Sequence, residues 1–140
     1  MTAYATLADM LARFETDELV QLADAANAAD AKLAARVASA VTTVTATING
    51  YLAAKYQLPI TPVPPLVTEI ACDLARHKMY RVAPPDSVTD ARDKALAALK
   101  DIAKGVIKLD AGSETIAARP EAVLVQGQPQ IFGRDKMSAY

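Results

Sequence analysis

The chain has 140 residues, of which 52% are hydrophobic, and its 15 basic and 16 acidic residues give a net charge of −1. This length suits one domain with a hydrophobic core, and the composition excludes a disordered chain and provides no strongly basic segment for general nucleic-acid binding. Because no apolar run approaches the roughly 20 residues of a membrane span and the start of the chain has no signal sequence, we expect the protein to stay in the cytoplasm in which it is made.

Two short helices are predicted at the start of the chain. Thr6 and Asp9 fit a capping box, in which each side chain accepts a hydrogen bond from an unpaired amide, and apolar residues then recur at helical spacing as far as Phe14. Thr16 is predicted to cap a second helix over Asp17–Ala23, whose acidic residues fall in the first turn, where the helix dipole favours them.

The longest predicted element is a helix over Ala31–Tyr56, capped by Asp30. Its apolar stripe has spacings of three and four residues: Leu33, Val37, Val41, Val44, Ile48 and Leu52. Residues 41–48 are rich in β-branched side chains and could pair as a strand, but the stripe continues on both sides, which favours one helix. Gly50 costs about 1 kcal/mol relative to alanine here, and it indicates a kink or a close helix contact.

Prolines delimit the second half of the predicted bundle. Gln57–Pro65 contains four prolines, so we expect an extended strap that carries the chain back along the long helix and whose last proline opens the next helix, Leu66–Val82. A second capping box, Ser87–Asp90, predicts a helix over Val88–Lys104. Gly105 stands where a glycine commonly ends a helix.

These elements predict an all-α fold in which residues 1–109 form a small helical bundle, with a long central helix, two further helices and short N-terminal helices. Residues 110–140 have no helical period but are too apolar for a segment that meets only solvent, so we predict an extended C-terminal arm that can add a short β segment at Ala122–Val125. The residues predicted to dock this arm on a partner are Val123, Val125, Ile131, Phe132, Arg134, Met137 and Tyr140.

No pattern indicates catalysis, a metal site or a cofactor. The only histidine, His77, lies between Arg76 and Lys78, whereas a general base needs a positioned partner and a pocket. Cys72 lies in mid-helix among apolar residues, which favours a core residue over a nucleophile. Gly127–Gly133 lacks the lysine of a phosphate-binding loop, and no spacing resembles a metal site. We therefore predict a non-enzymatic protein with no catalytic, cofactor-binding or metal-binding residues.

One local basic cluster, Arg76–Arg81, falls at the predicted end of a helix, where the helix dipole favours positive charge. It is also the only candidate recognition helix for a different class of function, that of a small helical DNA-binding regulator. A third possibility is an ordinary helical domain whose C-terminal tail has no role.

Seven segments spread over nearly the whole chain carry a resemblance to a known family: Tyr4–Leu7, Ala12–Phe14, Ile48–Pro59, Val63–Leu66, Ala71–Arg76, Lys100–Gly105 and Phe132–Met137. In this order they resemble the Mu-like prophage head-to-tail joining family. The resemblance implies a neck adaptor of a tailed phage or prophage, a helical subunit that forms a ring, commonly twelvefold, beneath the portal.

The resemblance also implies the partners of such a subunit. They are further copies of itself, the portal protein, and a downstream neck or tail-completion protein. DNA would pass through the ring without sequence-specific recognition. The protein would be found in the host cytoplasm during assembly and in the virion neck afterwards.

Overall fold

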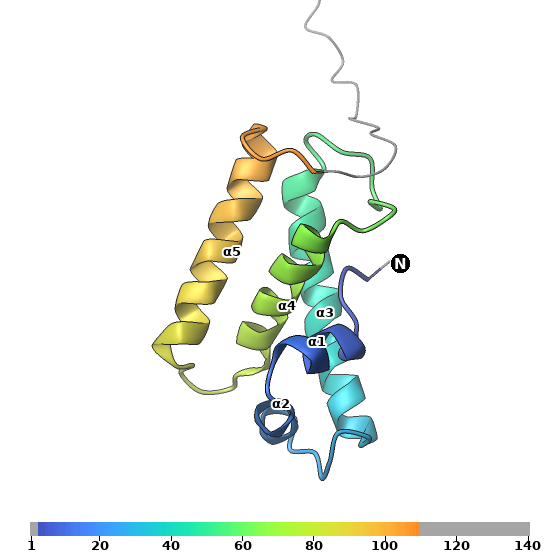
Figure 1. Ribbon diagram of the computed structural model, residues 1–140, viewed down its shortest axis with the longest axis vertical. Coiled ribbons are helices and arrows are strands. Elements are labelled where there is room, and N and C mark those ends of the chain that lie inside the picture. The colour runs from blue at the N-terminus through green and yellow to red at the C-terminus, as the bar shows by residue number, and fades with distance from the viewer. Residues whose placement is uncertain (1–2, 110–140) are drawn as a thin grey trace, which may run out of the picture.

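The structure, a computed structural model, describes residues 3–109, and within them it has five helices and no strand (Figure 1). The helices are α1 (Leu7–Arg13), α2 (Thr16–Leu22), α3 (Ala31–Leu52), α4 (Pro65–Met79) and α5 (Asp86–Lys104). The all-α prediction is confirmed, and the β-branched run at 41–48 is helical.

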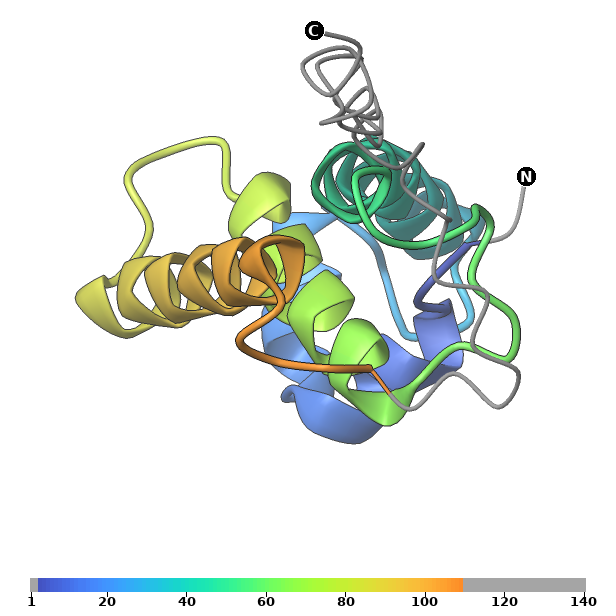
Figure 2. The same cartoon turned by 90° about the horizontal axis from the view of Figure 1, so that it is seen from above.

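The helices α3, α4 and α5 run up, down and up along the molecule and pack as a bundle with α4 between the other two (Figures 1 and 2). All six residues of the predicted α3 stripe are buried in this bundle, so the long helix was correctly oriented from its spacing. The same core contains apolar residues of the two partner helices: Val67, Ile70, Ala71, Leu74, Ala75, Met79, Ala95, Leu99 and Ile102.

The short helices α1 and α2 lie on one side of the bundle, where α1 contacts both α3 and α4 (Figure 2). The predicted capping box begins α1, since the Asp9 amide donates to the Thr6 hydroxyl and the Thr6 amide donates to the Asp9 carboxylate. Asp30 caps α3, as predicted, by accepting a hydrogen bond from the Lys32 amide at 3.0 Å. These two starts were predictable because each cap is a local interaction.

Two other helices begin earlier than predicted. Thr16 is the first residue of α2 rather than its cap, and Glu15 at the cap position makes no side-chain capping bond. Helix α5 begins at Asp86, directly after Pro85, so Ser87 lies inside the helix and the predicted second capping box is wrong. Pro85 has the extended backbone of a residue that precedes a helix, and it sets the start in place of the serine.

The loop between α3 and α4 bends and does not form the predicted straight strap. The chain bends at residues 58–59 and 61–62, and α4 begins near the end of the molecule at which α3 stops (Figure 1). Ile60 is buried, and its amide donates to the hydroxyl of Tyr4, which in turn donates to the side-chain oxygen of Asn49. The expected return of the loop along α3 is wrong because α4 itself makes that return.

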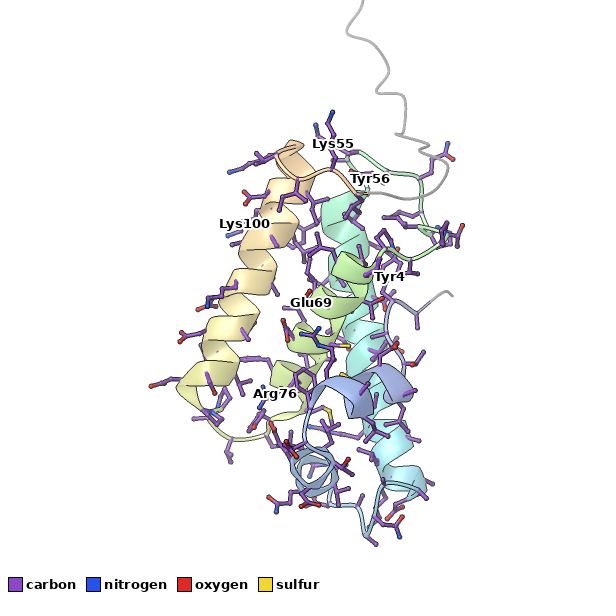
Figure 3. The ribbon with its side chains drawn as sticks, in the orientation of Figure 1. Tyr4, Lys55, Tyr56, Glu69, Arg76 and Lys100 are labelled. Carbon is purple, nitrogen blue, oxygen red and sulfur yellow. The ribbon has the colours of Figure 1, made fainter. Side chains whose placement is uncertain are left out.

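Helix α3 ends at Leu52, short of the predicted Tyr56, and this end meets the last described residues of the chain. Gly105 takes the left-handed conformation, with φ of 82°, that ends α5 as predicted. The chain then runs to Leu109, which is buried and donates from its amide to the Tyr56 hydroxyl at 3.1 Å. The described chain therefore ends beside the C-terminal end of α3, near Tyr56 in Figure 3.

Helix α4 begins at Pro65, as predicted, and ends at Met79 rather than at Val82. Tyr80 leaves the helix, and its hydroxyl donates to the Glu18 carboxylate at 2.7 Å. The Met79 carbonyl, which has no partner inside the helix, accepts a hydrogen bond from the Arg36 guanidinium of α3 at 3.0 Å. Contacts from distant segments thus fix the end of α4.

Candidate functional site

The residues predicted to dock the C-terminal arm all lie outside the described residues: Val123, Val125, Ile131, Phe132, Arg134, Met137 and Tyr140. The boundary between the helical domain at 1–109 and the arm at 110–140 stays a prediction. Leu109, the last described residue before this segment, is held against Tyr56 at one end of the bundle.

Cys72 and His77 occupy positions that suit structural residues. Cys72 is fully buried, and burial raises the pKa of its thiol to about 11, which opposes formation of the nucleophilic thiolate. His77 is partly buried, and its pKa lies below the ordinary value because of burial and then because of the nearby charges of Arg92 and Lys78. Within residues 3–109, no group of three His, Cys, Asp or Glu side chains could hold a metal ion, and no helix is long and apolar enough to cross a membrane.

The basic cluster at 76–81 is used mainly to hold α2 against α4. The Arg76 guanidinium, labelled in Figure 3, donates two hydrogen bonds of 2.8 Å to the Glu18 carboxylate. It also lies over the Phe14 ring, 4.8 Å from its centroid. Tyr80 donates to the same carboxylate, and Arg81 lies 3.5 Å from the Asp24 carboxylate. Sequence reasoning placed this cluster at a helix end but missed its partners, which lie 57 to 62 residues away in the chain.

The electrostatics of Glu18 follow from these contacts. Burial alone would raise the pKa of this carboxyl group, but the hydrogen bonds from Arg76 and Tyr80 and the charge of Arg76 outweigh it, so its pKa is lowered. The hydrogen bond to Glu18 also raises the pKa of the Arg76 guanidinium. Glu18 and Arg76 are therefore a charged pair across the neutral range, which leaves Arg76 committed to an internal contact.

A distinct surface is formed by the outward side of α3, which has no charged residue between Arg36 and Lys55. We call it the uncharged face of α3. Its exposed residues in the helix are Ala38, Ser39, Thr42, Thr43, Ala46, Thr47 and Gly50, and it continues just after the helix end with Ala53 and Ala54. The exposed side of a helix in a globular protein usually carries charged residues. An uncharged exposed side of this length is suited to contact with another protein surface.

Two details of the uncharged face lower the free-energy cost of burying it against another surface. The hydroxyls of Thr42, Thr43 and Thr47 donate to carbonyls four residues earlier in the same helix, so these donors need no water. A Cβ atom at Gly50 would meet nothing within 4 Å, so this glycine is not explained by close packing among the described residues. The expected helix contact at Gly50 is therefore not found within the described bundle, although the glycine leaves room for a close approach from outside.

A groove of about 250 Å³ lies next to this face, between α3, α4 and α5. Its lining combines three apolar side chains with three basic side chains and one threonine: Val44, Leu74, Leu96, His77, Lys78, Arg92 and Thr47. Thr47 belongs to both the uncharged face and the groove, so the two surfaces are continuous.

Comparison with known proteins agrees with the phage origin implied by the sequence. The chain matches the family model described as Bacteriophage Mu, Gp36 over residues 4–126. It is 33% identical to gene product J of Escherichia phage Mu over 135 residues, which cover 94% of each chain. It is also 23% identical over 141 residues to the Mu-like prophage FluMu protein gp36 of Haemophilus influenzae, with 100% of this chain and 99% of that one covered. This chain therefore belongs to the Bacteriophage Mu Gp36 family.

Proposed function

We propose that this chain is a non-enzymatic structural subunit of the head–tail connector of a Mu-like phage or prophage. Copies of the subunit form a ring beneath the portal protein, and the ring is the platform on which later neck or tail-completion proteins dock. Membership of the Gp36 family supports the phage origin. The observation that carries the assembly role is the uncharged face of α3.

The chemistry of this face suits contact between subunits. Small side chains allow two backbones to come close together, and the threonine hydroxyls are already bonded inside the helix, so burial leaves few polar groups without a partner. A ring requires each copy to present one surface to one neighbour and a different surface to the other. The uncharged face supplies one of these two surfaces.

The internal contacts of Arg76, Tyr80 and Arg81 in the basic cluster support a structural role over the alternative of a DNA-binding regulator. A recognition helix needs basic or amide side chains free to reach base edges. Arg76 is bound to Glu18, Tyr80 donates to the same carboxylate, and Arg81 lies beside Asp24. We accordingly propose that DNA passes through the ring without sequence-specific contacts, and that the protein occupies the host cytoplasm during assembly and the virion neck afterwards.

Deletion of the gene from an inducible phage, followed by electron microscopy of the lysate, tests the connector role. We expect heads and tails to accumulate unjoined, and we expect the parent gene supplied in trans to restore joined, infectious particles. Joined particles in the absence of the gene product would contradict the proposal.

Two matched variants, each replacing one exposed alanine with glutamate, test the role of the uncharged face in the same assay. Ala46 lies on this face and Ala97 lies on α5, and both alanines are exposed. Ala46→Glu should fail to restore joining, because it buries an unpaired charge at the contact, whereas Ala97→Glu should restore it. Equal restoration by both variants would exclude the uncharged face as a subunit contact.

A further inference from the structure

The groove between α3, α4 and α5 has an apolar lining with positive charge beside it. Val44, Leu74 and Leu96 supply the apolar part, one from each helix. The charge comes from Lys78 on α4 and from Arg92 on α5, while His77, whose pKa is lowered, is neutral at pH 7 and α3 contributes only the neutral Thr47. This combination suits an extended segment that carries one carboxylate next to apolar side chains.

The positive charge is only partly neutralised by the described residues. The Arg92 guanidinium donates to the carboxylate of its neighbour Asp93 at 2.8 Å, which compensates one charge. Lys78 is exposed, and among residues 3–109 no carboxylate lies within ion-pair distance of its ammonium group. An incoming carboxylate would therefore find an available partner at Lys78.

One segment of the same chain has the matching composition. Residues 120–125 read Pro-Glu-Ala-Val-Leu-Val, which places the carboxylate of Glu121 directly before an apolar run. Pro120 favours an extended approach. Residues 3–109 contain no strand, so this part of another copy offers the apolar run no sheet edge to which it could add. It does offer the groove between the helices.

We propose that the groove binds residues 120–125 of the C-terminal arm of a neighbouring copy, with Glu121 at Lys78 and Arg92 and the apolar run along Val44, Leu74 and Leu96. The presence of a neighbouring copy follows from the ring in the proposed function, so this inference depends on that function. A copy seated on the uncharged face of α3 lies beside the groove, because Thr47 belongs to both surfaces.

The arm is long enough for this contact. Glu121 comes twelve positions after Leu109, and an extended chain covers about 3.3 Å per residue, so the segment reaches up to about 40 Å from its anchor. The 22 residues of α3 span about 33 Å at 1.5 Å per residue. The reach therefore exceeds the length of the bundle, and an arm anchored at one end of α3 can cross to the groove of an adjacent copy.

Disulfide cross-linking in the purified full-length chain tests the contact. Thr47→Cys combined with Val123→Cys places one thiol in the groove and one in the arm, and Ala97→Cys combined with Val123→Cys is the matched control on the exposed side of α5. Under a mild oxidant, the first pair should give on the order of tenfold more covalent dimer than the control, because docking raises the effective concentration of the arm thiol. The natural Cys72 is buried, and the Val123→Cys variant alone measures its background reaction.

Charge reversal adds a second readout that a random collision would not show. Lys78→Glu in the Thr47→Cys, Val123→Cys chain should reduce the covalent dimer several-fold, and adding Glu121→Lys should recover it. Equal dimer in the test and control pairs, no dimer in either, a cross-link within one chain only, or no response to Lys78→Glu would each overturn the proposal.

Sedimentation of the same samples before oxidation separates this proposal from the proposed function. Oligomers that are present before oxidation but give no Thr47–Val123 cross-link when the oxidant is added would overturn the groove contact and leave the ring intact. A chain that stays monomeric, together with phage that join heads and tails without it, would overturn the ring and the groove contact with it.

Discussion

Arg76 and Glu18 form an ion pair with two hydrogen bonds of 2.8 Å, and this pair joins α4 to α2 across 58 residues of sequence. Both side chains retain 23% of their exposure, so the pair is shielded from water more than an ordinary surface ion pair. The Phe14 ring lies beneath the guanidinium and extends the contact to the segment between α1 and α2. Arg76 therefore helps to attach the two short helices to the bundle, together with apolar contacts and the ion pairs of Arg13 on α1 with Glu69 and Asp73 on α4.

Arg76→Lys should lower the free energy of unfolding by about 1–3 kcal/mol, because lysine cannot make the two parallel hydrogen bonds or stack in the same way on Phe14. Thermal melting followed by circular dichroism measures the loss. Arg81→Lys is the control, since Arg81 is largely exposed and lies 3.5 Å from Asp24, and its melting should match that of the parent. Equal melting of all three proteins would show that the pair does not attach α2.

Glu18→Gln should remove a part of the stability that depends on pH. The pKa of Glu18 in the folded chain lies below its ordinary value of 4.5, so the charged form contributes stability that is fully present above pH 4.5 and is lost as the pH falls through the folded pKa. The gap in unfolding free energy between the parent and Glu18→Gln should therefore be constant at neutral pH and should close in acid. A gap that stays constant below pH 4 would contradict the assignment.

Val44→Asp should destabilise the bundle by several kcal/mol, because Val44 is 1% exposed and the new carboxylate would be buried among apolar side chains. Chemical denaturation at low protein concentration measures the change. Ala97→Asp on the exposed side of α5 is the control and should cost less than about 1 kcal/mol. If the two variants unfold alike, Val44 does not lie in the core.

Gly50→Ala should act in opposite directions on folding and on assembly. Alanine is favoured over glycine in a helix by about 1 kcal/mol, and a Cβ atom at this position meets nothing within 4 Å, so the subunit should become more stable. The added methyl group should weaken self-association if the uncharged face of α3 is a close contact between copies. Melting of a dilute sample and sedimentation of a concentrated one measure the two effects.

Gly105→Ala is the control variant for Gly50→Ala. Gly105 has a φ of 82°, so alanine there should destabilise the subunit by about 1 kcal/mol. Stabilisation by Gly50→Ala with unchanged self-association would show that Gly50 does not face a neighbour.

The parts of the fold that follow from local interactions were predictable from the sequence. The spacing of the α3 stripe identified its buried side, and the caps at Thr6 and Asp30 and the glycine at 105 identified helix ends, because each involves residues within one turn. The helix starts at Asp86 and Thr16 were displaced because a neighbouring residue, such as Pro85, set the start in place of the expected hydroxyl cap.

The features that depend on distant segments were not predictable. Tyr56 and Tyr80 lie beyond the ends of α3 and α4, and each bonds to a segment more than 50 residues away. The ion pair of Arg76 with Glu18 and the groove also need three-dimensional proximity that neither spacing nor composition reveals. The uncharged stretch of α3 was visible in the sequence, but its exposure became apparent only when the opposite side was seen to be buried.

Electron cryomicroscopy of the neck of the assembled particle would show directly whether these subunits form a ring. We predict a ring of helical bundles around the particle axis beneath the portal, in which the uncharged face of α3 in each copy is covered by the next copy. A neck without this bundle, or a ring in which the uncharged face of α3 is exposed to solvent, would contradict this prediction.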